Sequence, residues 1–161
     1  MREILTHPHV QLRKIAQVIT SFDKEFLELC EMMTTLMKAG PGGVGIAAPQ
    51  LGELLRVIVV DCSLGQHPCK NHGHLVMANP VILTASGKAL GREGCLSVPD
   101  WVATVPRSKK ISVQYQDMSG EMHTLHASGF EARVIQHEVD HLDGILFIDR
   151  VLSTHDLVRR M

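Results

Sequence analysis

Aromatic side chains are scarce in this sequence, which has four Phe, one Trp and one Tyr among 161 residues. A buried core must therefore be filled mainly by Leu, Ile, Val and Met. Long apolar runs are absent as well, because the stretches at 54–55 and 57–60 are far shorter than the ~20 residues that a membrane-spanning helix needs. We therefore expect a soluble protein without a membrane partner.

An excess of charge of one sign is also absent, since 16 Lys and Arg residues balance 17 Asp and Glu residues. This balance provides no basic surface for nucleic acid, so we expect no direct nucleic-acid specificity. The apolar fraction of 45% argues against intrinsic disorder. A chain of this length can bury roughly 70% of its unfolded surface. The sequence therefore predicts one domain over residues 1–161.

The first residues contain neither the apolar segment of a secretion signal nor the composition of an organellar transit peptide. We therefore predict a reducing compartment: a bacterial cytoplasm, or an organelle matrix if a presequence has been removed. In such a compartment cysteines are expected to be thiols or metal ligands rather than disulfides. The cysteines are Cys30, Cys62, Cys69 and Cys95.

The apolar pattern predicts two helices with a region of short strands between them. Apolar residues recur at helical spacing from Ser21 to Ala39, and Gly40 ends this segment. A second helix begins after Ser128, which forms a predicted capping box with Glu131, and ends at Gly144. Strand-like segments lie between these helices at 55–61, 75–78, 81–84, 110–116 and 121–126.

The dipeptide Asn79-Pro80 is expected to separate the strand at 75–78 from the strand at 81–84. The predicted fold class is α+β, with short antiparallel sheets around a central C-terminal helix and an additional N-terminal helix.

The second predicted helix contains the sequence His137-Glu138-Val139-Asp140-His141. Residues four apart share a helix face, so both imidazoles can bind one metal ion. Glu138 projects about 100° away from His137, beside the ion, where it can accept a proton from a water molecule. The alternative is a helix whose two histidines only cover the edge of the core.

A third metal ligand has to come from upstream of this helix. Some zinc proteases have a third His six residues after the second, but that position is Phe147, and no Glu follows Glu138. The best candidate is Cys95, because a thiolate is a strong ligand for zinc or ferrous iron. The alternative is a small buried thiol.

A glycine-rich segment, Gly43-Val44-Gly45-Ile46-Ala47-Ala48-Pro49-Gln50, leaves backbone groups open to a ligand. It is not a phosphate loop, because no Gly-Lys-Ser/Thr follows. The Gln50 amide can donate a hydrogen bond to a developing oxyanion. The alternative is a glycine turn that leads into a strand.

Together these segments resemble the three signature motifs of peptide deformylases, in the same order. The resemblance is carried by segments 43–50, 93–97 and 136–144 and extends over nearly the whole chain, including Asn79-Pro80 and Val105-Pro106-Arg107. Residues 127–133 are also similar to the mitochondrial-type branch of the family. The resemblance implies an α+β enzyme that removes the formyl group from the N-terminal formyl-methionine of nascent polypeptides.

The resemblance also implies roles for individual residues. The family's metal is Fe²⁺ in the cell, with Zn²⁺, Ni²⁺ or Co²⁺ as substitutes. Its general acid/base would be Glu138, and its oxyanion donors would be the Gln50 side chain and the Leu96 backbone N–H. Nascent formylated polypeptides would be the partners, with transient ribosome contact. The implied metal ligands are Cys95, His137 and His141.

The substrate is expected to bind in extended form along the glycine-rich segment, with its methionine side chain in an apolar pocket. The residues expected to contact it are Val44, Gly45, Gly94, Phe130 and Val134. Trp101 either borders the substrate cleft or packs locally.

Charged residues near the motifs are expected to support the metal ligands. Glu93 and Arg107 are predicted to pair and to brace the Cys95 loop, with two solvated surface charges as the alternative. Asp140 is predicted to orient a ligand imidazole through its free N–H.

A second metal site could be imagined in the loop that contains Cys62, His67, Cys69, His72 and His74. The cysteine spacing exceeds that of a zinc ribbon, so we expect a polar surface loop instead. Two other functions remain open: a metal-dependent amidase for a different acyl group, and an inactive homologue that binds peptide. The complete motifs argue against both.

Overall fold

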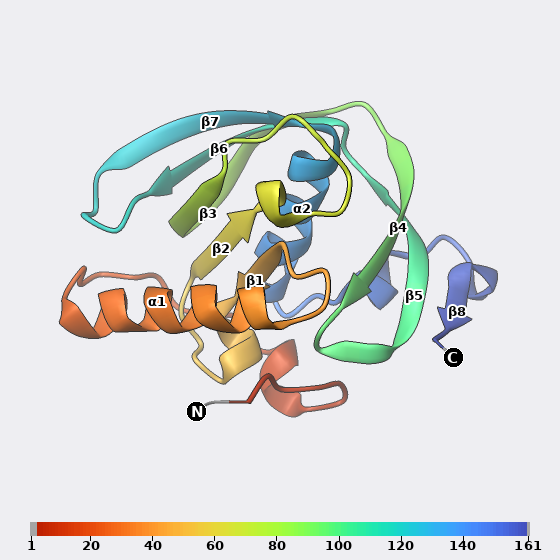
Figure 1. The fold of residues 1–161 in the computed structure, drawn as a ribbon, viewed down its shortest axis with the longest axis horizontal. Helices are drawn as coiled ribbons and strands as arrows, with labels where there is room; N and C mark the ends of the chain where they lie inside the picture. The colour runs from red at the N-terminus through yellow and green to blue at the C-terminus, as the bar shows by residue number, and fades with distance from the viewer. Residues whose placement is uncertain (1–2, 161) are drawn as a thin grey trace.

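The computed structural model describes residues 3–160, which form two helices and two antiparallel sheets (Figure 1). The larger sheet has the spatial order β1 (Gly45–Ala47), β2 (Val57–Asp61), β3 (His74–Ser86), β6 (Lys110–Gln116) and β7 (Met122–Ser128). The smaller sheet has the order β4 (Ala89–Cys95), β5 (Val98–Arg107) and β8 (Leu157–Arg159). The helices are α1 (Lys24–Ala39) and α2 (Gly129–Leu142).

Short 3-10 helices join several of these elements, at Val10–Arg13, Ala48–Leu51, Cys62–Leu64, Phe147–Arg150 and Thr154–Asp156. Helix α2 lies between the larger sheet and the β4–β5 hairpin (Figure 1). The predicted α+β class, with a central C-terminal helix, is confirmed. Neither helix in residues 3–160 has the length and apolar character that a bilayer crossing requires.

Strand β2 shows how the sequence builds a core on both faces of the larger sheet. All five of its residues are buried, as expected for a strand that is covered on both faces. Because successive side chains point to opposite faces, Val57 and Val59 pack with Met33 of α1. Ile58 and Val60 belong to the other cluster, which includes side chains of α2.

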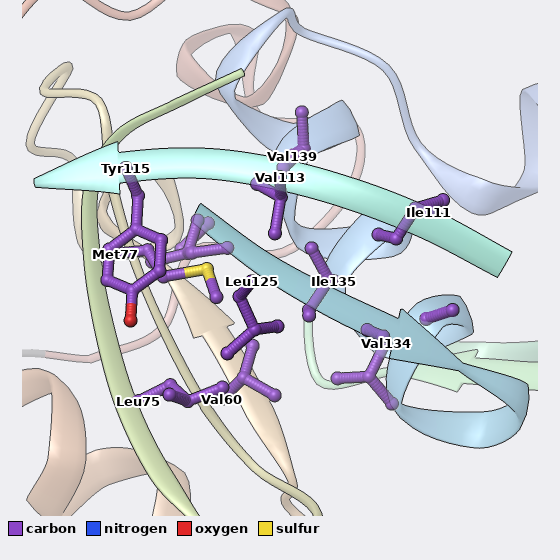
Figure 2. Packing of buried hydrophobic residues seen from close by; sticks show 14 of the residues in the cluster. Val60, Leu75, Met77, Ile111, Val113, Tyr115, Leu125, Val134, Ile135 and Val139 are labelled. Carbon is purple, nitrogen blue, oxygen red and sulfur yellow. The ribbon is translucent and has the colours of Figure 1, made fainter. Parts of the chain in front are cut away.

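Figure 2 shows this second cluster from close by. Residues Val134, Ile135 and Val139 of α2 lie against the inner face of the sheet. They meet side chains from β2, β3, β6 and β7, among them Val60, Leu75, Met77, Ile111, Val113, Tyr115 and Leu125. Fully burying a side chain of this size is worth about 1.5–3 kcal/mol, so this contact fixes α2 in position.

Helix α1 starts later than predicted, and helix α2 starts after Ser128 as predicted but without the predicted capping box. Helix α1 begins at Lys24, because the Asp23 side chain accepts a hydrogen bond from Phe26 N at 3.0 Å and caps it there. Ser128 is the N-cap of α2, but its side chain makes no capping hydrogen bond. The predicted capping box is wrong because Glu131 accepts from His72 N at 2.7 Å instead, which ties the loop before β3 to the helix.

Asn79 and Pro80 do not break a strand, contrary to the prediction. Strand β3 runs through them, and its pairing with β6 shifts register between Ala78 and Val81. Asn79 has a positive φ of 51°. Its side chain accepts from Ile19 N at 2.7 Å and donates to Ile19 O at 3.0 Å, so a local bulge replaces the break.

Candidate metal centre

The three predicted metal ligands come together where α2 meets the β4–β5 hairpin. Cys95 Sγ lies 3.4 Å from His141 Nε2, and one ligand atom each from Cys95, His137 and His141 lie within 4.8 Å of one another. A thiolate and an imidazole that share a tetrahedral ion are about 3.6 Å apart, given bond lengths of about 2.3 and 2.1 Å. The three side chains therefore fit one divalent cation.

Both histidines are held by α2, but their surroundings shift their pKa values in opposite directions. Burial favours the neutral form of His137, but hydrogen bonds with Cys95 and Glu93 outweigh it and raise the pKa of His137 well above its usual value. Burial, together with the positive charges of His137 and Arg107, lowers the pKa of His141 well below its usual value. His137 is 8% exposed and His141 is 1% exposed. Their spacing of four residues places both rings on the helix face toward the hairpin.

Cys95 reaches the histidines through an irregularity in the hairpin. Leu96 and Ser97 form a two-residue turn, across which Cys95 pairs with Val98. The register of β4 against β5 shifts between Glu93 and Cys95. Such a bulge changes the direction in which the following side chain points, and here it brings the thiol toward α2.

Glu93 connects this hairpin to the histidines. Its carboxylate lies 2.8 Å from His137 Nδ1 and accepts two hydrogen bonds from Arg107, each of 3.0 Å. Arg133 donates a further hydrogen bond of 2.7 Å. Burial opposes the charged form, but the hydrogen bonds from His137 and Arg107 outweigh it and lower the pKa of Glu93 to about 2. The predicted Glu93–Arg107 pair is present, and it is buried rather than solvated.

The prediction that Asp140 orients a ligand imidazole is wrong. Asp140 instead accepts a hydrogen bond of 2.6 Å from Arg107 and two from Arg150, at 2.8 and 3.0 Å. Glu93 takes the predicted role, because it contacts the ring nitrogen of His137 that lies away from the ligand group. Its position two residues before Cys95 is the signal in the sequence that points to this role.

Glu138 and Gln50 complete the surroundings of the ligand group. Glu138 is 5% exposed, and its Oε1 has no hydrogen-bond partner among residues 3–160. Burial raises the pKa of Glu138 to about 7. Gln50 Oε1 accepts from Ala47 N at 2.9 Å, which directs its amide nitrogen toward Ser97 Oγ at 3.0 Å and Cys95 Sγ at 3.7 Å.

A cavity of about 370 Å³ opens at this group. It is bordered by all three motifs and by the first turns of α2, where Phe130 is 44% exposed. The predicted substrate-binding residues all line it: Val44, Gly45, Gly94, Phe130 and Val134. Trp101 does not line this cavity and packs locally in the cluster around β5.

Comparisons with known proteins agree with this geometry. The family model described as "Polypeptide deformylase" matches residues 1–156. The chain belongs to the polypeptide deformylase family. A peptide deformylase of Desulfotalea psychrophila is 43% identical over 151 residues, which are 94% of this chain and 88% of that protein.

Solved structures of deformylases share the fold as well. The crystal structure of a peptide deformylase from Legionella pneumophila has a TM-score of 0.87 at 37% identity and covers 97% of this chain and 88% of that one. A Met-Ala-Ser-bound deformylase structure from Acinetobacter baumannii has a TM-score of 0.85 at 38% identity. The match covers 93% of this chain and 98% of that one. This chain is accordingly a divalent-metal enzyme that removes N-terminal formyl groups.

Arg133 of this deformylase-family site has no role assigned from the sequence motifs, and its orientation becomes clear only in the folded chain. Its guanidinium is buried and donates to Val105 O and to Ala89 O, each at 2.8 Å. Together with the bond to Glu93, these contacts fasten α2 to both strands of the hairpin that carries Cys95. An Arg one turn before His137 is the signal in the sequence, but its partners are all distant along the chain.

Other groups of metal-binding residue types lie outside the deformylase site. Within residues 3–160 a second group consists of Asp117, Glu121 and His123 on the exposed β6–β7 hairpin, where Asp117 bonds to its own turn. The loop with Cys62 and Cys69 contributes to neither group in this part of the chain. Cys69 Sγ lies 3.9 Å from Cys62 O, and the cysteines are free thiols.

Gly45 provides a direct test of the packing around Glu138. A Cβ atom added at Gly45 would lie 2.6 Å from Glu138 Oε2 and 2.9 Å from Val134 Cγ1. We therefore expect Gly45→Ala to displace the Glu138 carboxylate and to lower kcat by about tenfold or more, since small displacements of a catalytic group are costly. Steady-state kinetics check this, and an unchanged melting temperature with unchanged kcat would contradict it.

Proposed function

We propose that Cys95, His137 and His141 bind one cation, Fe²⁺ in the cell, and that this site hydrolyses the formyl group of formyl-methionyl peptides. The observation that supports this most is the convergence of the three ligand atoms beside Glu138 and a 370 Å³ cavity. One thiolate and two imidazoles are a donor set that suits Fe²⁺ or Zn²⁺. Three protein ligands leave a position for water, as catalytic sites require.

Glu138 is the proposed general acid/base. When bound, the cation supplies positive charge that makes water more acidic and polarises the formyl carbonyl. Glu138 accepts the proton of the attacking water, since its Oε1 is buried without a hydrogen-bond partner among residues 3–160. Burial keeps its pKa near neutrality, so the same carboxyl group can return the proton to the leaving amine.

Gln50 and the Leu96 backbone N–H are the proposed oxyanion donors. The Gln50 amide is held from both ends, because its oxygen accepts from Ala47 N and its nitrogen donates to Ser97 Oγ. Its nitrogen therefore already faces the cavity beside Cys95. A donor that is fixed before reaction stabilises the developing charge without reorganisation, which is worth about 2.7–4 kcal/mol.

The substrate is proposed to lie in extended form between two strand edges. Strand β1 pairs only with β2, and β4 pairs only with β5, so each presents an edge among the described strands. Val44 and Gly45 at the first edge and Gly94 at the second line the cavity. Peptides commonly bind by pairing with such edges. The related Acinetobacter baumannii deformylase was crystallised with Met-Ala-Ser bound.

The methionine side chain is proposed to occupy the apolar part of the cavity between Val44, Phe130 and Val134. Nascent formylated polypeptides are the natural substrates of such a site, which places the enzyme where translation starts with formyl-methionine: the bacterial cytoplasm or an organelle matrix. Access to these chains implies a transient contact with the ribosome.

A single set of assays tests the proposed function. Protein purified without oxygen is expected to contain about one iron per chain and to hydrolyse formyl-Met-Ala-Ser. It should cleave acetyl-Met-Ala-Ser at least about tenfold more slowly, because one additional methyl group must fit beside the reacting carbon. Equal rates on both peptides would indicate a general amidase, and no hydrolysis by the metal-loaded protein would indicate a peptide-binding homologue.

A further inference from the structure

Two arginines at the mouth of the cavity have no partner in the part of the chain that is described. Arg92 of β4 and Arg160, directly after β8, both line the cavity and are exposed. Neither makes a hydrogen bond through its side chain or an ion pair with any of residues 3–160. The catalytic assignment uses neither residue.

The acidic groups that line the same cavity do not neutralise these arginines. Glu93 and Glu138 are its acidic lining residues, and both are buried. Glu93 already binds the guanidinium groups of Arg107 and Arg133. The mouth of the cavity therefore carries exposed positive charge, although the whole chain has a net charge of −1.

The position of both arginines can be related to an extended substrate. A Cβ atom added at Gly94 would lie 2.7 Å from Arg160 Nη2, so this guanidinium lies over the strand edge where the peptide is proposed to pair. Arg92 is two residues before Gly94, or about 6.8 Å along β4. The formyl group reacts near Cys95, so a peptide that runs back along β4 brings its next residues past Arg160 and Arg92.

We propose that Arg92 and Arg160 select formyl peptides with Asp or Glu at the third and fourth residues. This inference rests on the proposed function and defines its preferred substrate class. The anionic group could also be the C-terminal carboxylate of a short peptide, which has the same chemistry. Exposed pairs of this kind contribute modestly, so we expect about a fivefold preference from the two arginines together.

The test compares kcat/KM for three amidated peptides, formyl-Met-Ala-Asp-Asp, formyl-Met-Ala-Ala-Ala and formyl-Met-Ala-Lys-Lys. We expect about fivefold higher kcat/KM for the Asp peptide than for the Ala peptide, mainly through KM, and a lower value for the Lys peptide. The preference should decline as salt is raised from 0.05 to 0.5 M, since exposed charges are screened. Amidation removes the terminal carboxylate, and a free-acid Ala peptide measures its separate effect.

The variants make the result specific to the two arginines. In the double variant Arg92→Ala and Arg160→Ala, kcat/KM for the Asp peptide should become equal to kcat/KM for the Ala peptide. Replacing both arginines by Glu should give the Lys peptide the highest kcat/KM. Arg159→Ala is the matched control, because Arg159 is the exposed neighbour that does not line the cavity. A ratio that survives the double substitution, or that falls equally in Arg159→Ala, would overturn the inference. Failure to hydrolyse the Ala peptide would instead contradict the proposed function.

Discussion

Replacing Glu138 by Gln is expected to lower kcat for formyl hydrolysis by about 10³-fold while leaving the bound cation in place. The amide has nearly the same shape as the carboxyl group but cannot accept the proton of the attacking water. Loss of general acid/base catalysis typically costs about 10²–10⁴-fold. Glu138 is not one of the three side chains that form the ligand group, so cation content should not change. Steady-state kinetics and elemental analysis of the same preparation provide the two measurements.

The matched control for this variant is Glu131→Gln. Glu131 lies on the same helix, two turns before Glu138, and is 1% exposed, but it contacts His72 and does not line the cavity. We expect this substitution to lower the melting temperature without a comparable loss of kcat. If Glu138→Gln retained both its cation and turnover within tenfold of the wild type, the assignment of the proton acceptor to Glu138 would be wrong.

Helix α2 and the spacing of its two histidines could be predicted from local sequence alone. The spacing of four residues between His137 and His141 is close to one turn of a helix. The apolar spacing that predicts α1 also involves only residues close together in the sequence. The strands of the larger sheet alternate or form short apolar runs, as β2 and β6 do, so most of them were predicted with small errors at their ends.

The smaller sheet could not be predicted in the same way. Strand β4 reads Ala-Leu-Gly-Arg-Glu-Gly-Cys, with two glycines and two charges in seven residues, so neither alternation nor β-propensity marks it. Glu93 is buried there because Arg107 and Arg133 reach it from positions 14 and 40 residues away. These compensating contacts exist only in the folded chain, and they explain why a charged residue occupies a buried strand position.

The surroundings of the three proposed metal ligands depend on the same distant contacts. The sequence predicts that Asp140 orients a ligand imidazole, yet the carboxylate that contacts His137 comes from β4. Successive side chains of a helix point about 100° apart, so Asp140 does not share the direction of His141. It points toward Arg107 and Arg150 instead. The packing of the β4–β5 hairpin against α2 therefore determines that Glu93, and not Asp140, contacts the imidazole of His137.

Replacing Cys95 by Ala is expected to remove the cation and, with it, essentially all turnover. Two imidazoles alone bind a divalent cation far more weakly than two imidazoles and a thiolate. Elemental analysis after dialysis should show less than about one tenth of the wild-type metal content, and kcat should fall to the background. Cys69→Ala is the control, because Cys69 is a half-buried thiol of the loop before β3 and lies outside the ligand group.

Melting temperatures separate loss of the cation from damage to the fold. A ligand present at 100 times its Kd stabilises the native state by about 2.7 kcal/mol, which corresponds to about 5–10 °C for a chain of this size. Chelation should therefore lower the melting temperature of the wild type by about that amount and should have no effect on Cys95→Ala. The chelated wild type and the variant should then unfold within a few degrees of each other. A variant that still responded to chelation would hold its cation without the thiol, and Cys95 would have to be removed from the proposed ligand set.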